Sequence, residues 1–119
     1  MLLPFGDKDV TLLHKAESGY TRHALTGCSW TDTDAHTLNG NVIQHTLEIT
    51  CRIPAFDQQK PRPGDVLILG DVAVQAASEI ALMKELERVR GEGYSAFRVQ
   101  RVKDNSQSGI LAHYAASGE

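Results

Sequence analysis

The sequence predicts a mainly β (α+β) protein, a small antiparallel β-barrel or sandwich with one inserted α-helix at about residues 76–90. Several segments alternate apolar and polar residues, as strands with one buried face do, and turn residues separate these segments. One segment places its apolar residues at helical spacing instead. Since 119 residues suffice for one core and not for two, residues 1–119 are predicted to form a single domain.

The first two strands are predicted at Asp9–Lys15 and Tyr20–Trp30, joined as a hairpin by the turn at residues 17–19. In the first strand Val10, Leu12 and His14 share a face. Gly27 lies inside the second strand and predicts a bulge or a close backbone approach. The polar segment Thr31–Gly40 (TDTDAHTLNG) ends in Asn-Gly and predicts a loop with a tight turn.

The clearest strand is Asn41–Pro54, bounded by turn residues and rich in Ile and Thr. Its apolar face is predicted to consist of Ile43, His45, Leu47, Ile49, Cys51 and Ile53. The next segment, Ala55–Asp65, contains two prolines and a Pro-Gly turn, so it predicts a stiff, exposed connection with Lys60 and Arg62 as its basic residues. Val66–Leu69 is a short apolar run and predicts a strand buried on both faces.

The predicted helix, Ala76–Arg90, has Ser78 as its N-cap, acidic Glu79 in its first turn and basic residues in its last turn. Gly91 is expected to end it. Leu82, Leu86 and Val89 form a narrow apolar stripe that predicts packing against a sheet or a partner.

The C-terminal part predicts an antiparallel hairpin of Ser95–Lys103 and Ile110–Ala115 across a turn at residues 104–109. Phe97 and Val99 share one face of its first strand, while Arg98 and Gln100 lie on the other. The last five residues, AASGE, are expected to fray.

Composition narrows the classes of function. The net charge of −3 argues against a dedicated nucleic-acid binder, which is usually basic. The N-terminus lacks the features of a signal peptide, and no apolar run reaches the ~20 residues of a membrane span, so we expect a cytosolic product. Cys28 and Cys51 are predicted to be two buried thiols, with a bridge between neighbouring strands as the alternative. Neither belongs to a CxxC pair, so structural zinc is not expected.

No pattern predicts catalysis, a cofactor or a metal. Asp32 and Asp34 form a DxD that could bind a cation, but the other oxygen ligands of an EF-hand are missing and a solvated loop is favoured. The five histidines lack metal-site spacing, and His45 is expected in the core. His23 and Cys28 could form a nucleophile pair, yet nothing supplies a third, orienting group.

Two further features are open to more than one interpretation. Trp30 suits either an interface hot spot or the core. Arg98, Arg101 and Lys103 could face nucleic acid or an acidic protein, although a solvated sheet face is favoured.

Four segments carry a resemblance to a known family: VTLLHK (residues 10–15), GYTRHALTGCSW (19–30), KPRPGDVLILGD (60–71) followed by a helix, and FRVQRVKDN with LAHYAASGE at the end. Together they span most of the chain. The combination resembles the small head-closure, or head–tail connector, proteins of tailed bacteriophages and prophages.

The resemblance implies a non-enzymatic β-barrel protomer of the virion, made in the host cytoplasm. It would assemble as a ring of twelve copies beneath the portal, contact portal or adaptor and tail-side neck proteins, and touch channel DNA without sequence preference. Loops and termini would reach neighbouring subunits, by position Thr31–Gly40, Phe56–Pro63 and the C-terminal tail. The candidate interface residues are Trp30, Asp32, Asp34, Phe56, Lys60, Arg62 and Tyr114.

Two other classes of protein remain as alternatives. A small barrel that binds nucleic acid or protein as a monomer would need a contiguous basic face with aromatic residues, and the chain has only seven aromatics (three Phe, three Tyr and one Trp). A small enzyme would need a pocket of converging titratable groups, which the sequence does not assemble.

Overall fold

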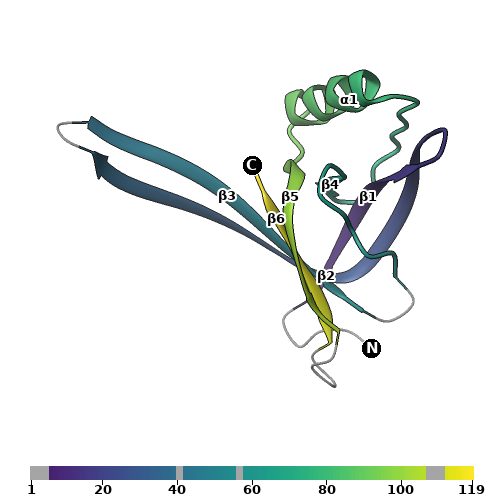
Figure 1. The fold of residues 1–119 in the computed structure, drawn as a ribbon, viewed down its shortest axis with the longest axis horizontal. Coiled ribbons are helices and arrows are strands. Elements are labelled where there is room, and N and C mark those ends of the chain that lie inside the picture. The colour runs from purple at the N-terminus through teal and green to yellow at the C-terminus, as the bar shows by residue number, and fades with distance from the viewer. Residues whose placement is uncertain (1–5, 40–41, 56–57, 107–111) are drawn as a thin grey trace.

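The computed structural model describes residues 6–39, 42–55, 58–106 and 112–119, with the backbone alone described at residues 33–39 and 42–47. These residues form a six-stranded antiparallel β-barrel with one α-helix (Figure 1), which confirms the predicted fold class. The strand order around the barrel is β1-β2-β3-β6-β5-β4. The elements are β1 (Lys8–Ala16), β2 (Gly19–Asn39), β3 (Val42–Pro54), β4 (Val66–Leu69), α1 (Glu79–Gly91), β5 (Ala96–Asn105) and β6 (His113–Gly118).

The N-terminal hairpin forms as predicted and contains the predicted bulge. The β1–β2 register runs from Ala16 opposite Gly19 to Val10 opposite Leu25, and then shifts so that Lys8 lies opposite Cys28. The extra residue of β2 falls beside Gly27, whose φ of +68° is one that glycine adopts without strain.

The predicted loop at Thr31–Gly40 is wrong, because β2 continues as a strand to Asn39. It pairs with β3 without interruption from Ser29 opposite Arg52 to Asn39 opposite Val42. Polar residues do not prevent this pairing, because the partner strand supplies the backbone hydrogen bonds and the chain beyond the barrel has no core to face. Gly40, the second residue of the predicted turn, lies outside the described residues.

Two apolar cores lie on the two faces of β1 and β4. One fills the barrel interior and includes Leu12, Ile53 and Phe97. The other lies between the barrel wall and α1, where Leu13 and Val66 meet the helix stripe. That stripe is the predicted one: Leu82, Leu86 and Val89 are all buried. β4 is buried on both faces as predicted, and so is the middle of β1, which the alternation of the sequence did not indicate.

The helix begins later than the sequence predicts and ends at Gly91. The Ser78 hydroxyl accepts a hydrogen bond from the Ala81 amide at 3.2 Å, which confirms the predicted cap. Ala76 lies outside the helix because its carbonyl accepts instead from the Tyr20 amide at 2.9 Å. The positive φ that closes the helix occurs at Gly93 rather than at Gly91. No described helix is long and apolar enough to cross a membrane.

The C-terminal hairpin also forms, but the frayed tail predicted for AASGE is wrong. β6 runs to Gly118 and lies between β3 and β5, where it closes the barrel. A Cβ on Gly118 would stand 2.0 Å from the Arg98 carbonyl oxygen, so the small residues of this strand permit close packing. The turn predicted at residues 104–109 and the strand start predicted at Ile110 fall largely outside the described residues.

Candidate functional site

The most distinctive feature of the fold is a two-stranded arm, which we define as Asp32–Asn39 of β2 and Val42–Glu48 of β3. β3 pairs with β6 only from Ile49 onward, so the strands of the arm pair only with each other. Figure 1 shows the arm leaving the barrel with no other described element beside it. From Ile49 to Val42, at about 3.4 Å a residue, it reaches about 24 Å. The radius of gyration, 14.9 Å, accordingly exceeds the about 13.5 Å of a compact domain of this length.

The root of the arm is fixed to the barrel by side chains of the barrel interior and of the surface. The Trp30 ring packs against Phe97 with centroids 5.3 Å apart, and the indole Nε1 donates to the Ser95 hydroxyl at 3.1 Å. Arg101 of β5 forms an ion pair with Glu48 of β3. The direction of the arm is therefore set by the barrel.

The arm also carries the net charge of the chain. Between Thr31 and Glu48 there are three acidic residues and no Lys or Arg. Of 15 acidic and 12 basic residues in all, this leaves 12 of each for the remainder, so the formal charge of −3 resides in this one segment. Glu48 pairs with Arg101 at the root, so the negative charge of the arm comes mainly from Asp32 and Asp34.

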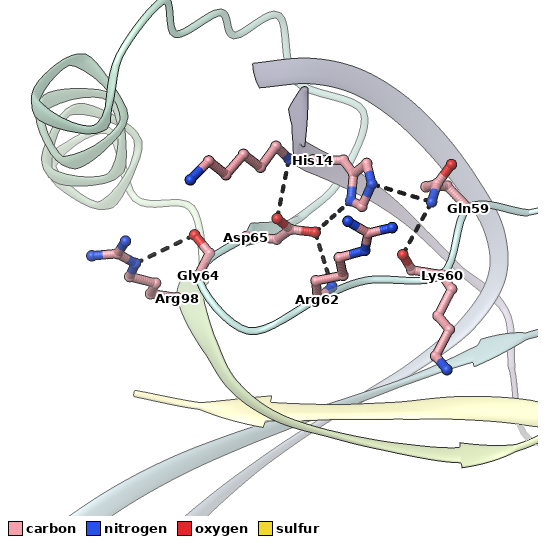
Figure 2. Close-up of polar contacts among 8 residues, drawn as sticks. His14, Gln59, Lys60, Arg62, Gly64, Asp65 and Arg98 are labelled. Carbon is pink, nitrogen blue, oxygen red and sulfur yellow. Dashed lines mark hydrogen bonds and ion pairs between the residues drawn. The ribbon is translucent and has the colours of Figure 1, made fainter. Parts of the chain in front are cut away.

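A second polar feature anchors the loop before β4, as Figure 2 shows. The Asp65 carboxylate, only 1% exposed, accepts hydrogen bonds from the His14 ring Nδ1 at 2.6 Å, the Lys15 amide at 3.2 Å and the Arg62 amide at 2.9 Å. On its other side His14 Nε2 lies 3.3 Å from the Gln59 amide nitrogen, which is a donor. His14 of β1 therefore contacts both Asp65 and Gln59, and these two contacts hold the loop against β1.

The other end of the same loop is tied to the bulge of β2. The Gln58 side chain accepts from the Thr26 amide at 2.7 Å and donates to the Thr26 and Pro54 carbonyls, both at 3.1 Å. One side-chain amide thus satisfies both backbone groups of a bulge residue. The prediction of an exposed connection is therefore confirmed at Lys60 and Arg62, but it is wrong at Gln58 and Asp65, where side chains anchor the loop.

His23 and the two cysteines do not form the nucleophile pair considered above. The His23 ring packs edge-on against His14 with centroids 6.0 Å apart, and burial, followed by the charge of His14, lowers the pKa of His23. The Cys28 thiol donates to the Thr26 carbonyl at 3.7 Å. Both cysteines are buried and unbridged, as predicted, and the hydrogen bond with Cys28 and burial raise the pKa of Cys51 well above its ordinary value.

The structure brings some of the candidate interface residues together. Lys60 is exposed, forms an ion pair with Asp104 at 2.8 Å and lies 5.8 Å from the centre of the Tyr114 ring. This contact holds the pKa of Asp104 far below its ordinary value. Arg62 is exposed beside the Asp65 anchor.

Three of the remaining candidates, Trp30, Asp32 and Asp34, lie on or near the arm. Asp32 is exposed where the arm begins, and Trp30 is half-buried at its root, so the core interpretation of this tryptophan holds in part. The side chain of Asp34, within the arm, and the whole of Phe56 lie outside the description. Among the described side chains, no group of three or more His, Cys, Asp or Glu is arranged to hold a metal ion.

Two of the three basic residues of β5 have acidic partners, and the third, Lys103, is exposed. Arg98 forms an ion pair with Glu79 at 2.6 Å, and Arg101 pairs with Glu48. These carboxylate partners reduce the attraction of Arg98 and Arg101 for other anions, and Arg98 also donates to the Gly64 carbonyl at 3.3 Å.

Sequence reasoning missed the anchors of the Gln58–Asp65 loop. The Gly-Asp pair at residues 64–65 resembled two other Gly-Asp turns, and only the tertiary contact with His14 distinguishes it. The available signal was the first strand, in which a histidine continues the apolar row of Val10 and Leu12 and therefore needs a buried partner.

Comparison with known proteins gives one match. The model of a family of unknown function, DUF6751, matches residues 5–119. No curated protein and no solved structure matches the chain.

Proposed function

Because the chain belongs to the DUF6751 family of unknown function, its role has to be inferred from its own residues, and we propose that it is a structural virion protein of a tailed bacteriophage or prophage. In this proposal it is a head-closure, or head–tail connector, subunit. It assembles as a ring, with twelve copies to match the portal, helps to retain the packaged DNA and joins the tail. It binds portal or adaptor proteins on one side and tail-side neck proteins on the other.

The arm is the observation that carries the proposal. A two-stranded ribbon that pairs only with itself is marginally stable in water, so a projecting ribbon of this length favours a role in which another molecule covers it. Open strand edges are a hazard for a free monomer and an asset for an assembling subunit. The fixed root at Trp30 suits a segment that must present a defined direction to a neighbour.

The acidic character of the arm agrees with this role. A subunit that lines a DNA channel has to avoid tight binding to phosphates, and a surface with negative charge and no Lys or Arg repels them. The barrel interior itself is filled by apolar side chains, so any channel is formed between subunits of a ring rather than through one barrel.

The alternative function, a monomeric nucleic-acid- or protein-binding module, has less support. It requires a contiguous basic face with exposed aromatic residues. Five described cations, those of Arg22, Lys60, Arg88, Arg98 and Arg101, instead form ion pairs with acidic side chains. Such pairing removes much of the attraction for phosphate.

Solution mass tests the proposal. Light scattering is carried out on the full chain alone and mixed with a candidate portal protein. We expect a ring-sized complex with the portal, or a ring alone, and loss of both when residues 34–46 are replaced by a short Gly-Ser turn. A monomer that ignores the portal and binds single-stranded DNA at moderate salt would refute the proposal and favour the binding module.

A further inference from the structure

The outer face of α1 is the second surface without a partner. The large apolar side chains that the described part of the chain exposes are Ile80 (72%), Met83 (40%) and Tyr94 (43%), all in α1 or just after it. Ile80, Met83 and Lys84 follow the i, i+3, i+4 spacing that places side chains on one helix face. We call these three residues the receiving face.

The receiving face is opposite the buried stripe of α1, and its one contact with the barrel among the described side chains is that of the Met83 sulfur with Arg98 at 3.5 Å. Leu82, Leu86 and Val89 pack inward, so the exposure of Ile80 does not serve the core. An isoleucine that is 72% exposed gains little from burial in the monomer, and together with Met83 it offers apolar area to another molecule.

We propose that the receiving face binds the arm of a second copy of this chain. The proposal rests on the proposed function, because it assigns the contact between neighbours in the ring. The described part of each copy has a projecting ribbon and an exposed apolar helix face at Ile80 and Met83, and Figure 1 shows the arm and α1 at different places on the molecule. A contact between two different surfaces of identical chains is heterologous, and repetition of such a contact produces a ring when the rotation closes.

The two surfaces match in length. The arm reaches about 24 Å beyond the barrel sheet, and the 13 residues of α1 span about 20 Å. A ribbon of this size can therefore cross or follow the first turns of the helix without the two barrels having to overlap.

The two surfaces also match in charge. The arm segment carries three acidic residues and no basic one. The receiving face includes Lys84 and lies in the N-terminal half of the helix, where the helix dipole is positive. Of the two nearest acidic residues, Glu79 is paired with Arg98, and Glu87 follows one turn later. Contact is thus expected on the first two turns of α1 and not near its C-terminal end.

Cross-linking between two different variants tests the contact. One sample carries Leu38→Cys in the arm and the other Ile80→Cys in the receiving face. The samples are mixed, assembled with the portal protein and treated with a short bis-maleimide. Cys28 and Cys51 are buried and serve as internal controls. We expect a covalent dimer in the mixture and none in a mixture of Leu38→Cys with unmodified chain.

A substitution pair gives the second measurement. Ile80→Glu is expected to weaken assembly at least tenfold, while Tyr94→Glu, which adds the same charge at an exposed position beyond the other end of α1, leaves it within twofold. Melting temperatures of both variants confirm that they fold. Rings that form without the cross-link, or equal effects of the two substitutions, would overturn this inference and leave the proposed function standing. A chain that stays monomeric under all conditions would overturn both.

Discussion

Replacing Asp65 by alanine tests the anchor of the Gln58–Asp65 loop. The substitution removes a carboxylate that is 1% exposed and leaves three donors without an acceptor: His14 Nδ1, the Lys15 amide and the Arg62 amide. A hydrogen bond to a charged group contributes ~1.5–3 kcal/mol, and a buried donor left without an acceptor costs ~1–3 kcal/mol. Because the three contacts share one carboxylate and do not add independently, we expect a loss of ~3–5 kcal/mol.

The free energy of unfolding in urea measures this loss, and the melting temperature should fall by roughly 10–20 °C for a domain of this size. Asp71→Ala is the matched control, because Asp71 also follows a glycine and pairs with a basic residue, Arg22, but its side chain is 69% exposed. The control should lose less than ~1 kcal/mol. If Asp65→Ala costs no more than Asp71→Ala, the carboxylate does not anchor the loop and the reasoning is wrong.

Three further predictions concern the barrel. Burial and His14 lower the pKa of His23 below the ordinary 6.5, so the unfolded chain binds this proton at a higher pH than the folded chain. The free energy of unfolding should therefore decrease as the pH falls below about 6.5. His23→Gln should reduce the slope of the unfolding free energy against pH between about 7.5 and 5. Trp30→Ala should lower the free energy of unfolding in urea by ~2–4 kcal/mol. Trp30→Phe keeps the ring contact with Phe97 and loses the hydrogen bond to Ser95, so it should cost only ~1 kcal/mol. Equal losses would contradict the role given to the ring. Cys28 and Cys51 should react with a thiol reagent at least ~10²-fold more slowly in the folded than in the unfolded chain, and fast labelling of the native protein would show that the barrel interior opens.

The sequence was informative wherever one face of a strand is buried. Ile49, Cys51 and Ile53 alternate with polar residues and are buried as predicted, and the same holds for Phe97 and Val99. The helix stripe was equally clear, since its residues meet a single barrel wall. In these segments burial imposes a period that can be read directly from the residues.

The arm could not be predicted in the same way. Its segment Thr31–Asn39 is a strand although it has no core to face, so burial imposes no hydrophobic alternation on it. The pairing comes from β3, whose own pattern was recognised, but register between distant segments is a tertiary property. The prediction that the C-terminal tail frays was wrong for a related reason. Ala116 and Gly118 fit a narrow place in the barrel, where small size matters more than apolar character.

The anchors at Asp65 and Gln58 depend on contacts that span 51 and 32 residues of sequence, and no local pattern announces them. A Pro-Gly-Asp turn has the same residues whether its carboxylate faces water or a histidine. The sequence could therefore indicate which residues lie in exposed loops, whereas the residues that contact them could be identified only from the fold.

The continuity of β2 has a mechanical consequence. One strand of 21 residues belongs to the barrel wall at its start and to the arm at its end, and its pairing with β3 is unbroken from Ser29 to Asn39. A neighbour that covers the ribbon and keeps it straight would make the arm a lever about its root at Trp30. For a lever of about 24 Å, a rotation of 10° at the root displaces the tip by roughly 4 Å, about the spacing of neighbouring strands. In such an assembly, small repacking inside the barrel would be amplified at the tip, and a load on the tip would be transmitted to the barrel interior.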